Sequence, residues 1–357
     1  MFDGNSEENI HLMIDLHNDV NDDALTLIAK YYLKEVGVKK TQIKEISQKE
    51  ITFMLETSQE EKIKRVEFPE EPKNSTEVSN FFYACLSQAR SNAPEGYPLS
   101  RLEKLIKKTL DLDTYITRVK SKREISSNII EITFKGGLEN LPDLQNDAFM
   151  YLIIHNDLNH KYPNKFSMRD FRELNTKENN PYSGAYYTIR SIRENEIDIW
   201  FVLHHNPGPL AVWAEKTVEK SEIAMWGPRT SFSPPNGTKS YLFIADETAQ
   251  PAVLASIENL RDEEKYICLF ETQNESTKFK YDDPQNRIEW IFRENIAAGE
   301  GTKLLKRVEN LSMDPKNLYV FCAGEAKQIS IIRKTLKKNL SLNADQMSFT
   351  GYWRKTG

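Results

Sequence analysis

The stretch Ser240-Tyr241-Leu242-Phe243-Ile244-Ala245 decides the fold of the C-terminal third of the chain, and it runs directly into Asp246-Glu247-Thr248-Ala249-Gln250-Pro251-Ala252. Six uncharged residues followed by a polar run are typical of a strand buried on both faces. Similar runs lie at 266–270, 288–292 and 318–323, and helical patterns extend to residue 260 and over 328–340. Strands that alternate with helices predict an α/β domain, with helices on both faces of a sheet, over residues 236–357.

The preceding part of the chain predicts an antiparallel β-barrel. Runs rich in β-branched and aromatic residues lie at 129–134, 148–154 and 197–203, and polar loops separate them. Few helical patterns intervene, which is typical of a barrel rather than of a parallel sheet. We therefore expect a barrel domain over residues 123–235.

Residues 1–98 predict a small α+β domain. We expect a strand at 10–14, a helix at 24–36, three strands at 43–46, 51–55 and 63–68, and a second helix at 78–89. The run Asn74-Ser75-Thr76-Glu77 has the form of a helix start. The run from Asn92 to Pro98 breaks the pattern, and a linker helix is expected within 99–122.

The composition limits the class of protein. The chain has 357 residues, of which 39% are hydrophobic and 28% charged, as in ordinary globular proteins of two or three domains. Lys+Arg 48 against Asp+Glu 53 gives a net charge of −5, which argues against a nucleic-acid-binding platform. The three cysteines are widely spaced and form no disulfide framework. The acidic N-terminus has no apolar core like that of a secretory signal. The sequence also contains no run of about 18 apolar residues, the length needed to span a bilayer. We therefore expect a cytoplasmic protein with no nucleic-acid partner and no membrane insertion.

The segment 203–214 contains the first candidate site. A strand ends at its start, the chain turns through Pro207-Gly208-Pro209, and a helix is expected from Pro209. Proline at the first helical position leaves the following N–H groups free, and the helix dipole favours an anion there. A diphosphate could dock on the N–H groups of Leu210 and Ala211. An ordinary strand–turn–helix junction is the alternative.

Two further segments place polar groups beside predicted strands. The run 246–248 follows the buried strand 240–245, at the strand end where open α/β sheets bind ligands, although it lacks the glycines of a dinucleotide fingerprint. In Tyr187-Thr188-Ile189-Arg190, the ring can stack on a flat ligand, the hydroxyl can bond a ring edge and the guanidinium can hold a phosphate. Tyrosine and threonine are also common in ordinary strands, which is the alternative interpretation.

Together these segments resemble one family. Residues 187–190 are similar to the Y-[ST]-x-R part of its flavin motif, and Leu203-His204, Gly208-Pro209 and Trp213-Ala214 are similar to its L-H…G-P-x-x-x-W-A segment. The remaining motifs follow in order as Gly227-Pro228-Arg229, Asp246-Glu247-Thr248-Ala249-x-Pro251-Ala252, Ala323-Gly324-Glu325-Ala326 and Gly351-Tyr352-Trp353-Arg354. Over about residues 115–357 this is the pattern of siderophore-interacting proteins, a branch of the ferredoxin-reductase-like flavoenzymes.

The resemblance implies an FAD-binding barrel, an NAD(P)H-binding α/β domain, and an NAD(P)H-dependent reductase that releases Fe(II) from ferric siderophores. Hydroxamate and catecholate oxygens bind Fe(III) far more tightly than Fe(II), so reduction frees the metal. Flavin is needed because NAD(P)H gives up a two-electron hydride whereas iron accepts one electron at a time. No catalytic nucleophile or general base is implied. A non-enzymatic protein that binds ferric siderophore or haem is the alternative, and a ferric-haem reductase is a third possibility.

The resemblance also implies roles for individual residues. It places Tyr187 and Thr188 at the isoalloxazine, with Arg190 supporting the ring or a phosphate, and the diphosphate side is formed by His204, Gly208, Pro209 and Trp213. It places Asp246, Glu247 and Thr248 near the nicotinamide, with Gly324 and Glu325 at a neighbouring strand end. Arg354 and Lys355 would attract an anionic ferric chelate.

The chain departs from the family pattern at two positions. The motif begins with an arginine two residues before the tyrosine, and this position is Ala185 here. A lost arginine–phosphate contact predicts looser flavin binding, unless Arg169, Arg172 or Arg229 substitutes. Lys220-Ser221 replaces the usual Gly-Asp after the tryptophan helix.

The N-terminal part is similar to a small domain at the C-terminal end of split-barrel haem-utilisation proteins. The matching residues are His17-Asn18-Asp19, Ala24-Leu25, Ile46, Phe68-Pro69, Ala84 and Ala89-Arg90. The resemblance implies haem as a second partner, with His17 as the candidate ligand. The second histidine of that family's H-N-x-D-H pattern is Asn21 here, and a structural or helix-capping His17 is the alternative.

Overall fold

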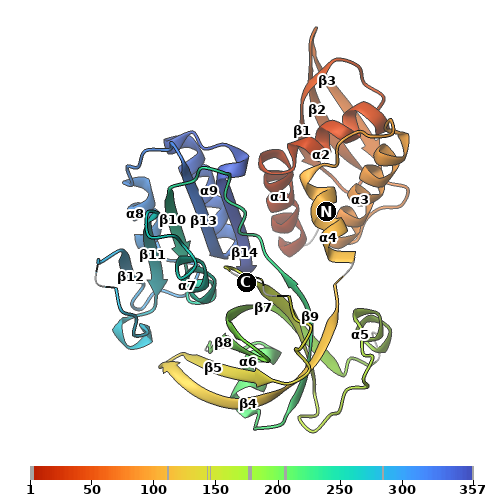
Figure 1. Ribbon diagram of the computed structural model, residues 1–357. Helices are drawn as coiled ribbons and strands as arrows, with labels where there is room; N and C mark the ends of the chain where they lie inside the picture. Colours follow the sequence, from red (N-terminus) through yellow and green to blue (C-terminus); the bar gives the residue numbers. More distant parts are fainter. Residues whose placement is uncertain are drawn as a thin grey trace. The chain divides into compact units, whose positions relative to one another are not determined.

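The computed structural model describes residues 4–110, 112–142, 144, 146–175, 179–204, 207–283 and 285–355. The chain divides into two compact units, with the division between residues 111 and 112. The first unit is α+β, and the second contains a β-barrel followed by an α/β sheet (Figure 1).

The first unit is a three-stranded antiparallel sheet, in the order β1-β2-β3, with helices packed on it. Its elements are α1 (Gly4–Asp19), α2 (Asp22–Leu27), a π-helical turn (Ile28–Tyr32), β1 (Val38–Ile46), β2 (Glu50–Thr57), β3 (Glu61–Glu67), α3 (Ser75–Asn92) and α4 (Arg101–Leu110). Asn74 caps α3 by accepting a hydrogen bond from the Glu77 N–H at 3.0 Å, as the sequence indicates. The α+β prediction for this part of the chain is confirmed.

Two local predictions in this unit are wrong. The strand expected at 10–14 is part of α1, because Ile10, Met13 and Ile14 lie on one helix face and contact the core. The helix expected at 24–36 ends as an α-helix at Leu27 and continues only through the π-helical turn.

His17 lies inside the first unit with only 4% of its surface exposed. Its ring is nearly parallel to the Phe82 ring, with 4.1 Å between the centroids, and Nδ1 is 3.2 Å from the Asn21 side-chain nitrogen. Burial lowers the pKa of His17 to about 4, so the imidazole is neutral. A ring covered in this way has no open side for haem iron. The structure therefore supports the structural role and gives no support to haem binding through His17.

The segment expected as a linker helix, 99–122, contains two different elements. Its helix, α4, is part of the first unit: Leu102 lies in that core, and Glu103 bonds the Arg90 guanidinium at 2.6 Å. Residues 114–122 belong instead to the first barrel strand, in which buried positions alternate with more exposed ones over residues 114–119. The helix is thus shorter than the predicted linker.

The second unit begins with a closed six-stranded antiparallel barrel, in the order β4-β5-β8-β7-β6-β9 (Figure 1). Its elements are β4 (Thr114–Ser126), β5 (Ile129–Lys135), β6 (Phe149–His155), α5 (Met168–Leu174), β7 (Tyr182–Arg193), β8 (Glu196–Val202), α6 (Pro209–Lys216) and β9 (Glu222–Arg229). The inward side chains and the apolar face of α6 form one core, which includes Phe134, Phe201 and Trp213. The barrel prediction is confirmed.

A parallel five-stranded sheet, in the order β12-β11-β10-β13-β14, completes the second unit. Its elements are β10 (Ser240–Ala245), α7 (Gln250–Ile257), β11 (Lys265–Thr272), β12 (Ile288–Phe292), α8 (Lys303–Glu309), β13 (Leu318–Glu325), α9 (Ala326–Leu340) and β14 (Met347–Trp353). Helices α8 and α9 cover one face, and α7 with the barrel residues Trp200 and Val202 covers the other. The carboxyl ends of β10 and β14 thereby lie beside the barrel.

Candidate functional site

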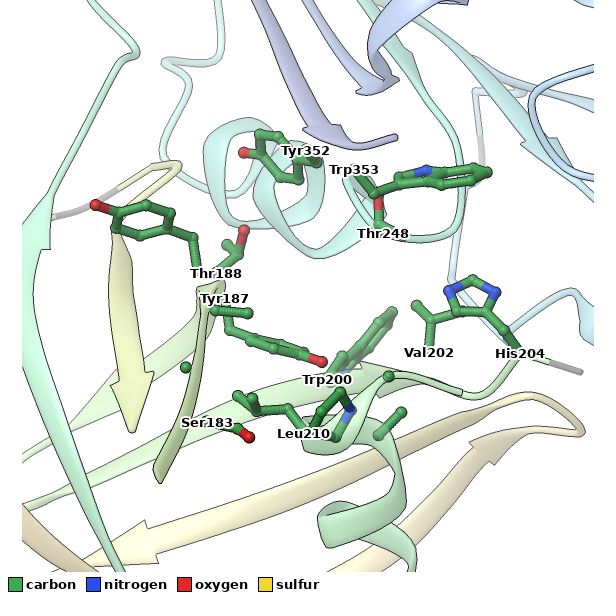
Figure 2. A pocket seen from close by; sticks show the side chains of 16 residues that line it. Ser183, Tyr187, Thr188, Trp200, Val202, His204, Leu210, Thr248, Tyr352 and Trp353 are labelled. Atoms are coloured by element: carbon green, nitrogen blue, oxygen red, sulfur yellow. The ribbon is translucent and has the colours of Figure 1, made fainter. Parts of the chain in front are cut away.

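A cavity of about 260 Å³ lies where the barrel meets the carboxyl ends of β10 and β14 (Figure 2). This is slightly below the usual range for small-molecule sites, about 300–1,000 Å³, so the cavity can enclose only part of a dinucleotide. Sixteen residues line it: Ser183, Gly184, Ala185, Tyr186, Tyr187, Thr188, Trp200, Val202, His204, Gly208, Pro209, Leu210, Ala211, Thr248, Tyr352 and Trp353. None of these lining residues is a lysine, arginine, aspartate or glutamate. The cavity therefore suits a flat, largely uncharged ring.

The β7 side of the cavity provides a ring and a hydroxyl. The Tyr187 ring contacts Phe201, with 4.6 Å between centroids, and burial raises the pKa of Tyr187 to about 12, so it stays neutral. Thr188 is 4% exposed, and its hydroxyl has no protein hydrogen-bond partner. In Figure 2 the Tyr187 ring lies on one side of the cavity and Tyr352 with Trp353 on the other. A planar ligand can stack between these aromatic groups.

The N-terminus of α6 forms another wall. Gly208 is the N-cap without a side-chain cap, and Pro209 occupies the first turn. The first N–H groups of a helix have no intrahelical acceptor, and here Leu210 and Ala211 both line the cavity. Backbone donors and the positive end of the helix dipole thus face the place where a ligand phosphate is expected. His204 also lines the cavity, with its ring 6.0 Å from the Trp353 ring.

Asp246 holds the opposite wall in place. Its carboxylate accepts hydrogen bonds from Trp353 Nε1 at 2.6 Å and from the Thr248 N–H and hydroxyl at 2.9 and 2.6 Å. Burial, reinforced by the neighbouring Glu247, raises the pKa of Asp246. Gly324 packs against this carboxyl group: a Cβ there would lie 2.7 Å from Asp246 Oδ2, and its φ of +156° also disfavours other residues.

Other predicted residues of the sheet edge have internal partners. Glu247 forms a two-pronged ion pair with Arg293, with both nitrogen–oxygen distances 2.8 Å. Glu271 lies 3.7 Å from the same guanidinium, and burial raises the pKa of Glu271 to about 7 against the attraction of Arg293. Glu325 caps α9 by accepting from the Gln328 N–H at 2.9 Å. Neither Glu247 nor Glu325 lines the cavity.

The predicted cationic contacts also lie away from the cavity lining. Arg190 makes two hydrogen bonds to Glu258, at 2.8 and 2.6 Å, and its guanidinium lies 5.7 Å from the Trp200 ring. Lys355 pairs with Glu300. Neither Arg190 nor Lys355 lines the cavity. Arg354 and Trp213 do not line it either, and Trp213 lies in the barrel core.

The structure bears on the arginines that we offered as substitutes at Ala185. Arg229 stacks over the Tyr186 ring at 4.7 Å, and Arg169 pairs with Glu173 at 2.7 Å. Neither of them lines the cavity, and nor does Arg172. Ala185 itself does, so among the described lining residues no guanidinium replaces the motif arginine.

Sequence reasoning missed several lining residues. Tyr352 and Trp353 were visible in the terminal Gly-Tyr-Trp-Arg motif, but nothing in the local pattern indicated that they face the barrel. Ser183 and Trp200 belong to strands and carried no separate signal.

Comparisons with known proteins agree with this arrangement. Residues 118–232 match the family model of the siderophore-interacting FAD-binding domain, and residues 238–356 match that of the siderophore-interacting protein. The ferric vibriobactin reductase ViuB of Vibrio cholerae is 24% identical over 244 residues, covering 66% of this chain and 87% of the relative. A siderophore utilization protein from T. fusca has the same fold over 69% of this chain and 94% of its own, with 23% identity and a TM-score of 0.59. The siderophore-interacting protein SipS from Aeromonas hydrophila has the same fold over 69% of this chain and 93% of its own, with 19% identity and a TM-score of 0.57.

No described helix is long and apolar enough to cross a bilayer. The described histidines, cysteines and acidic residues include no group of three or more arranged to hold a metal ion.

The cavity fits the FAD that the family implies. Its neutral aromatic walls suit an isoalloxazine ring, the unpartnered Thr188 hydroxyl can bond a ring edge, and the N–H groups at the start of α6 can receive a phosphate. The family matches begin at residue 118, so they do not include the first unit. Over residues 118–356 the chain belongs to the siderophore-interacting protein family, with a barrel that matches the family's FAD-binding domain and a parallel-sheet α/β domain.

Proposed function

We propose that this protein is a flavin-dependent oxidoreductase that transfers electrons from NAD(P)H to ferric siderophores. The observation that carries the proposal is the neutral aromatic cavity between the barrel and the carboxyl ends of β10 and β14. A flavin ring held there would be next to the edge at which open α/β sheets bind nucleotides. The ferric vibriobactin reductase among the relatives supports a ferric chelate as the acceptor.

The residues divide the binding task between ring and phosphate. Tyr187 provides a neutral stacking surface and Thr188 a hydroxyl, while Leu210 and Ala211 present backbone N–H groups. The Asp246 carboxyl accepts a hydrogen bond from the Trp353 indole and so holds this ring at the cavity. When bound, FAD supplies the ability to accept a two-electron hydride and to deliver electrons singly. The protein accordingly needs no nucleophile or general base.

The test measures flavin binding and iron release separately. Titration of FAD into the purified chain, followed by flavin fluorescence, gives the dissociation constant. Under anaerobic conditions, NADH or NADPH and a ferric siderophore are then added, and Fe(II) is trapped with a coloured Fe(II)-specific chelator. We expect two Fe(II) for each nicotinamide oxidised, in the presence of protein and FAD only.

Two variants make the test specific. Tyr187→Leu removes the stacking ring and should weaken FAD binding and iron release together, whereas Tyr83→Phe, in the first unit, should change neither. FAD binding without any chelate-dependent oxidation of NADH or NADPH would contradict the reductase assignment and would favour a binding protein.

A further inference from the structure

Three carboxyl groups of the described residues are buried together around one guanidinium at an edge of the parallel sheet. Asp246 and Glu247 directly follow β10, and Glu271 lies at the end of β11. The guanidinium belongs to Arg293, directly after β12. Each of the four side chains is less than a tenth exposed. If all of them were ionised, three negative charges would face one positive charge away from water. Because such an excess is costly to bury, we expect the group to hold a proton.

The hydrogen bonds indicate which carboxyl group holds it. Asp246 and Glu247 each accept several hydrogen bonds, which stabilise a carboxylate. Glu271 is less well supplied. Its Oε2 makes no hydrogen bond and lies 3.7 Å from the Arg293 guanidinium, and its Oε1 accepts a long bond of 3.4 Å from the Gln328 side chain. Glu271 is therefore the member of the group that takes up a proton most readily.

The surroundings of Glu271 set the pH at which this proton is lost. Burial raises the pKa of Glu271 to about 7. The attraction of Arg293 acts against burial, and the repulsion of Asp246 and Glu247 acts with it. The amide side chains that contact Glu271 from α7 and α9 are uncharged. Glu271 therefore gains a negative charge as the pH rises through about 7.

The group lies at the sheet edge where a dinucleotide is expected. Open α/β sheets bind ligands outside the carboxyl ends of their strands, at the point where the strand order reverses. In this sheet the order reverses between β10 and β13, and β11 is the other neighbour of β10. The diphosphate of NAD(P)H is negatively charged, so an additional negative charge at this edge repels it. The proton on Glu271 is thus coupled to dinucleotide binding through the electric field.

We propose that Glu271 controls the affinity of this sheet edge for NAD(P)H through one exchangeable proton. This inference rests on the proposed function, because it takes NAD(P)H to be the electron donor. Glu271 acts through its charge and through Arg293, for which it competes with Glu247 once the proton is lost, so it is a positioning residue. Since the neutral form binds the dinucleotide better, dinucleotide binding must in turn draw a proton from the solvent.

The experiment measures dinucleotide affinity and proton uptake in the full chain with FAD present. The ligand is the 1,4,5,6-tetrahydro analogue of whichever dinucleotide the parent oxidises, NADH or NADPH, because this analogue cannot donate a hydride. Calorimetric titrations on either side of pH 7 give the dissociation constant. Repeating them in two buffers with different heats of ionisation gives the number of protons taken up.

Three variants make the measurement specific. Glu271→Gln keeps the size of the side chain and has the charge of the protonated form. Glu247→Gln removes the group that competes for Arg293. Glu289→Gln is the matched control, because Glu289 is an ion-paired carboxylate of the same sheet, bonded to Arg307 at 2.9 Å on β12.

We expect the parent to bind the analogue about three- to tenfold more weakly at pH 8.5 than at pH 6, with proton uptake near pH 7. Glu271→Gln should bind it at both pH values as tightly as the parent does at pH 6, without this proton uptake. In Glu247→Gln the loss of affinity should move to lower pH by about one unit, because Arg293 can then pair with Glu271. Glu289→Gln should follow the parent within twofold.

Three results would overturn the inference. The first is a parent whose affinity for the analogue is the same at pH 6 and pH 8.5. The second is a folded Glu271→Gln that keeps the pH dependence of the parent, and the third is a Glu247→Gln in which that dependence does not move. In each case a parent that binds FAD and reduces ferric chelates would leave the proposed function standing. If the parent oxidises neither NADH nor NADPH and binds neither analogue, the inference and the proposed function fall together.

Discussion

The substitution Ala185→Arg tests how this cavity holds a phosphate. Ala185 lines the cavity two residues before Tyr187 on β7, and no lysine or arginine is among the described lining residues. An arginine at this position would be the first side-chain cation in the lining. A hydrogen bond between a guanidinium and a phosphate contributes about 1.5–3 kcal/mol, which corresponds to a gain of about 10- to 150-fold in FAD affinity.

Three comparisons separate charge from size. Riboflavin has the same ring and no phosphate, so its affinity should change less than twofold. Ala185→Gln adds length without charge and should leave FAD affinity close to that of the parent. Raising the ionic strength should reduce the gain of the arginine variant, because salt screens an exposed charge pair.

The refuting results are specific. If the arginine variant is folded and binds FAD no more tightly, the phosphate does not lie within reach of position 185. If riboflavin gains as much as FAD, the new side chain acts on the ring and not on the phosphate. Either outcome would contradict our inference that the missing arginine at position 185 weakens the binding of the FAD phosphate.

The remaining predictions concern residues around the cavity and in the first unit. Asp246→Ala leaves Trp353 Nε1 without its acceptor and should weaken FAD binding about five- to tenfold in a fluorescence titration. Asp246→Asn keeps an acceptor oxygen and should weaken FAD binding less than threefold. Equal losses in the two variants would show that the carboxylate charge matters instead. Because the pKa of His17 is about 4 when folded and about 6.5 when unfolded, the unfolded chain binds the proton first, so stability is greatest above pH 6.5 and falls as the pH drops toward 4. Between pH 7 and 5 this costs the first unit on the order of 2 kcal/mol, and hydrogen exchange in that unit should show that His17→Phe removes this part of the pH dependence; an unchanged slope would contradict it. Arg190→Ala breaks the ion pair with Glu258 and should lower the free energy of unfolding by about 1 kcal/mol. The FAD affinity of this variant should change less than twofold. A tenfold loss of affinity would show that Arg190 supports the flavin after all.

The parts of the fold that could be predicted are those with local signals. The uncharged run 240–245 is a central strand of the parallel sheet, as its composition indicates. The cap at Asn74 could be predicted because an asparagine side chain accepts a hydrogen bond from a free N–H group of the first helical turn. The helix start at Pro209 could be predicted because proline has no N–H group that would need an acceptor there. The strand expected at 10–14 failed because five residues are too few to distinguish alternation from helical spacing.

The site was only partly predictable, for a related reason. Tyr187 and Thr188 both line the cavity, although adjacent residues of a strand point to opposite faces. The partners of Arg190 and Glu247 are 68 and 46 residues away, and no local pattern shows that Glu258 and Arg293 use these charges inside the protein. Polar residues in a motif therefore indicated the sheet edge at which the cavity lies, without showing which of them line it.

The distribution of charge explains why an uncharged cavity can exist at an acidic sheet edge. Glu247 is neutralised by Arg293, and Asp246 is shielded behind its bonds to Trp353 and Thr248. If these charges were not paired or covered, their field would oppose a phosphate at the start of α6. Because they are, flavin affinity in the parent chain should depend on stacking, hydroxyl contacts and backbone donors, and should change little with salt. A steep loss of FAD affinity between low and high salt in the parent would show that a cation outside the described lining takes part in binding.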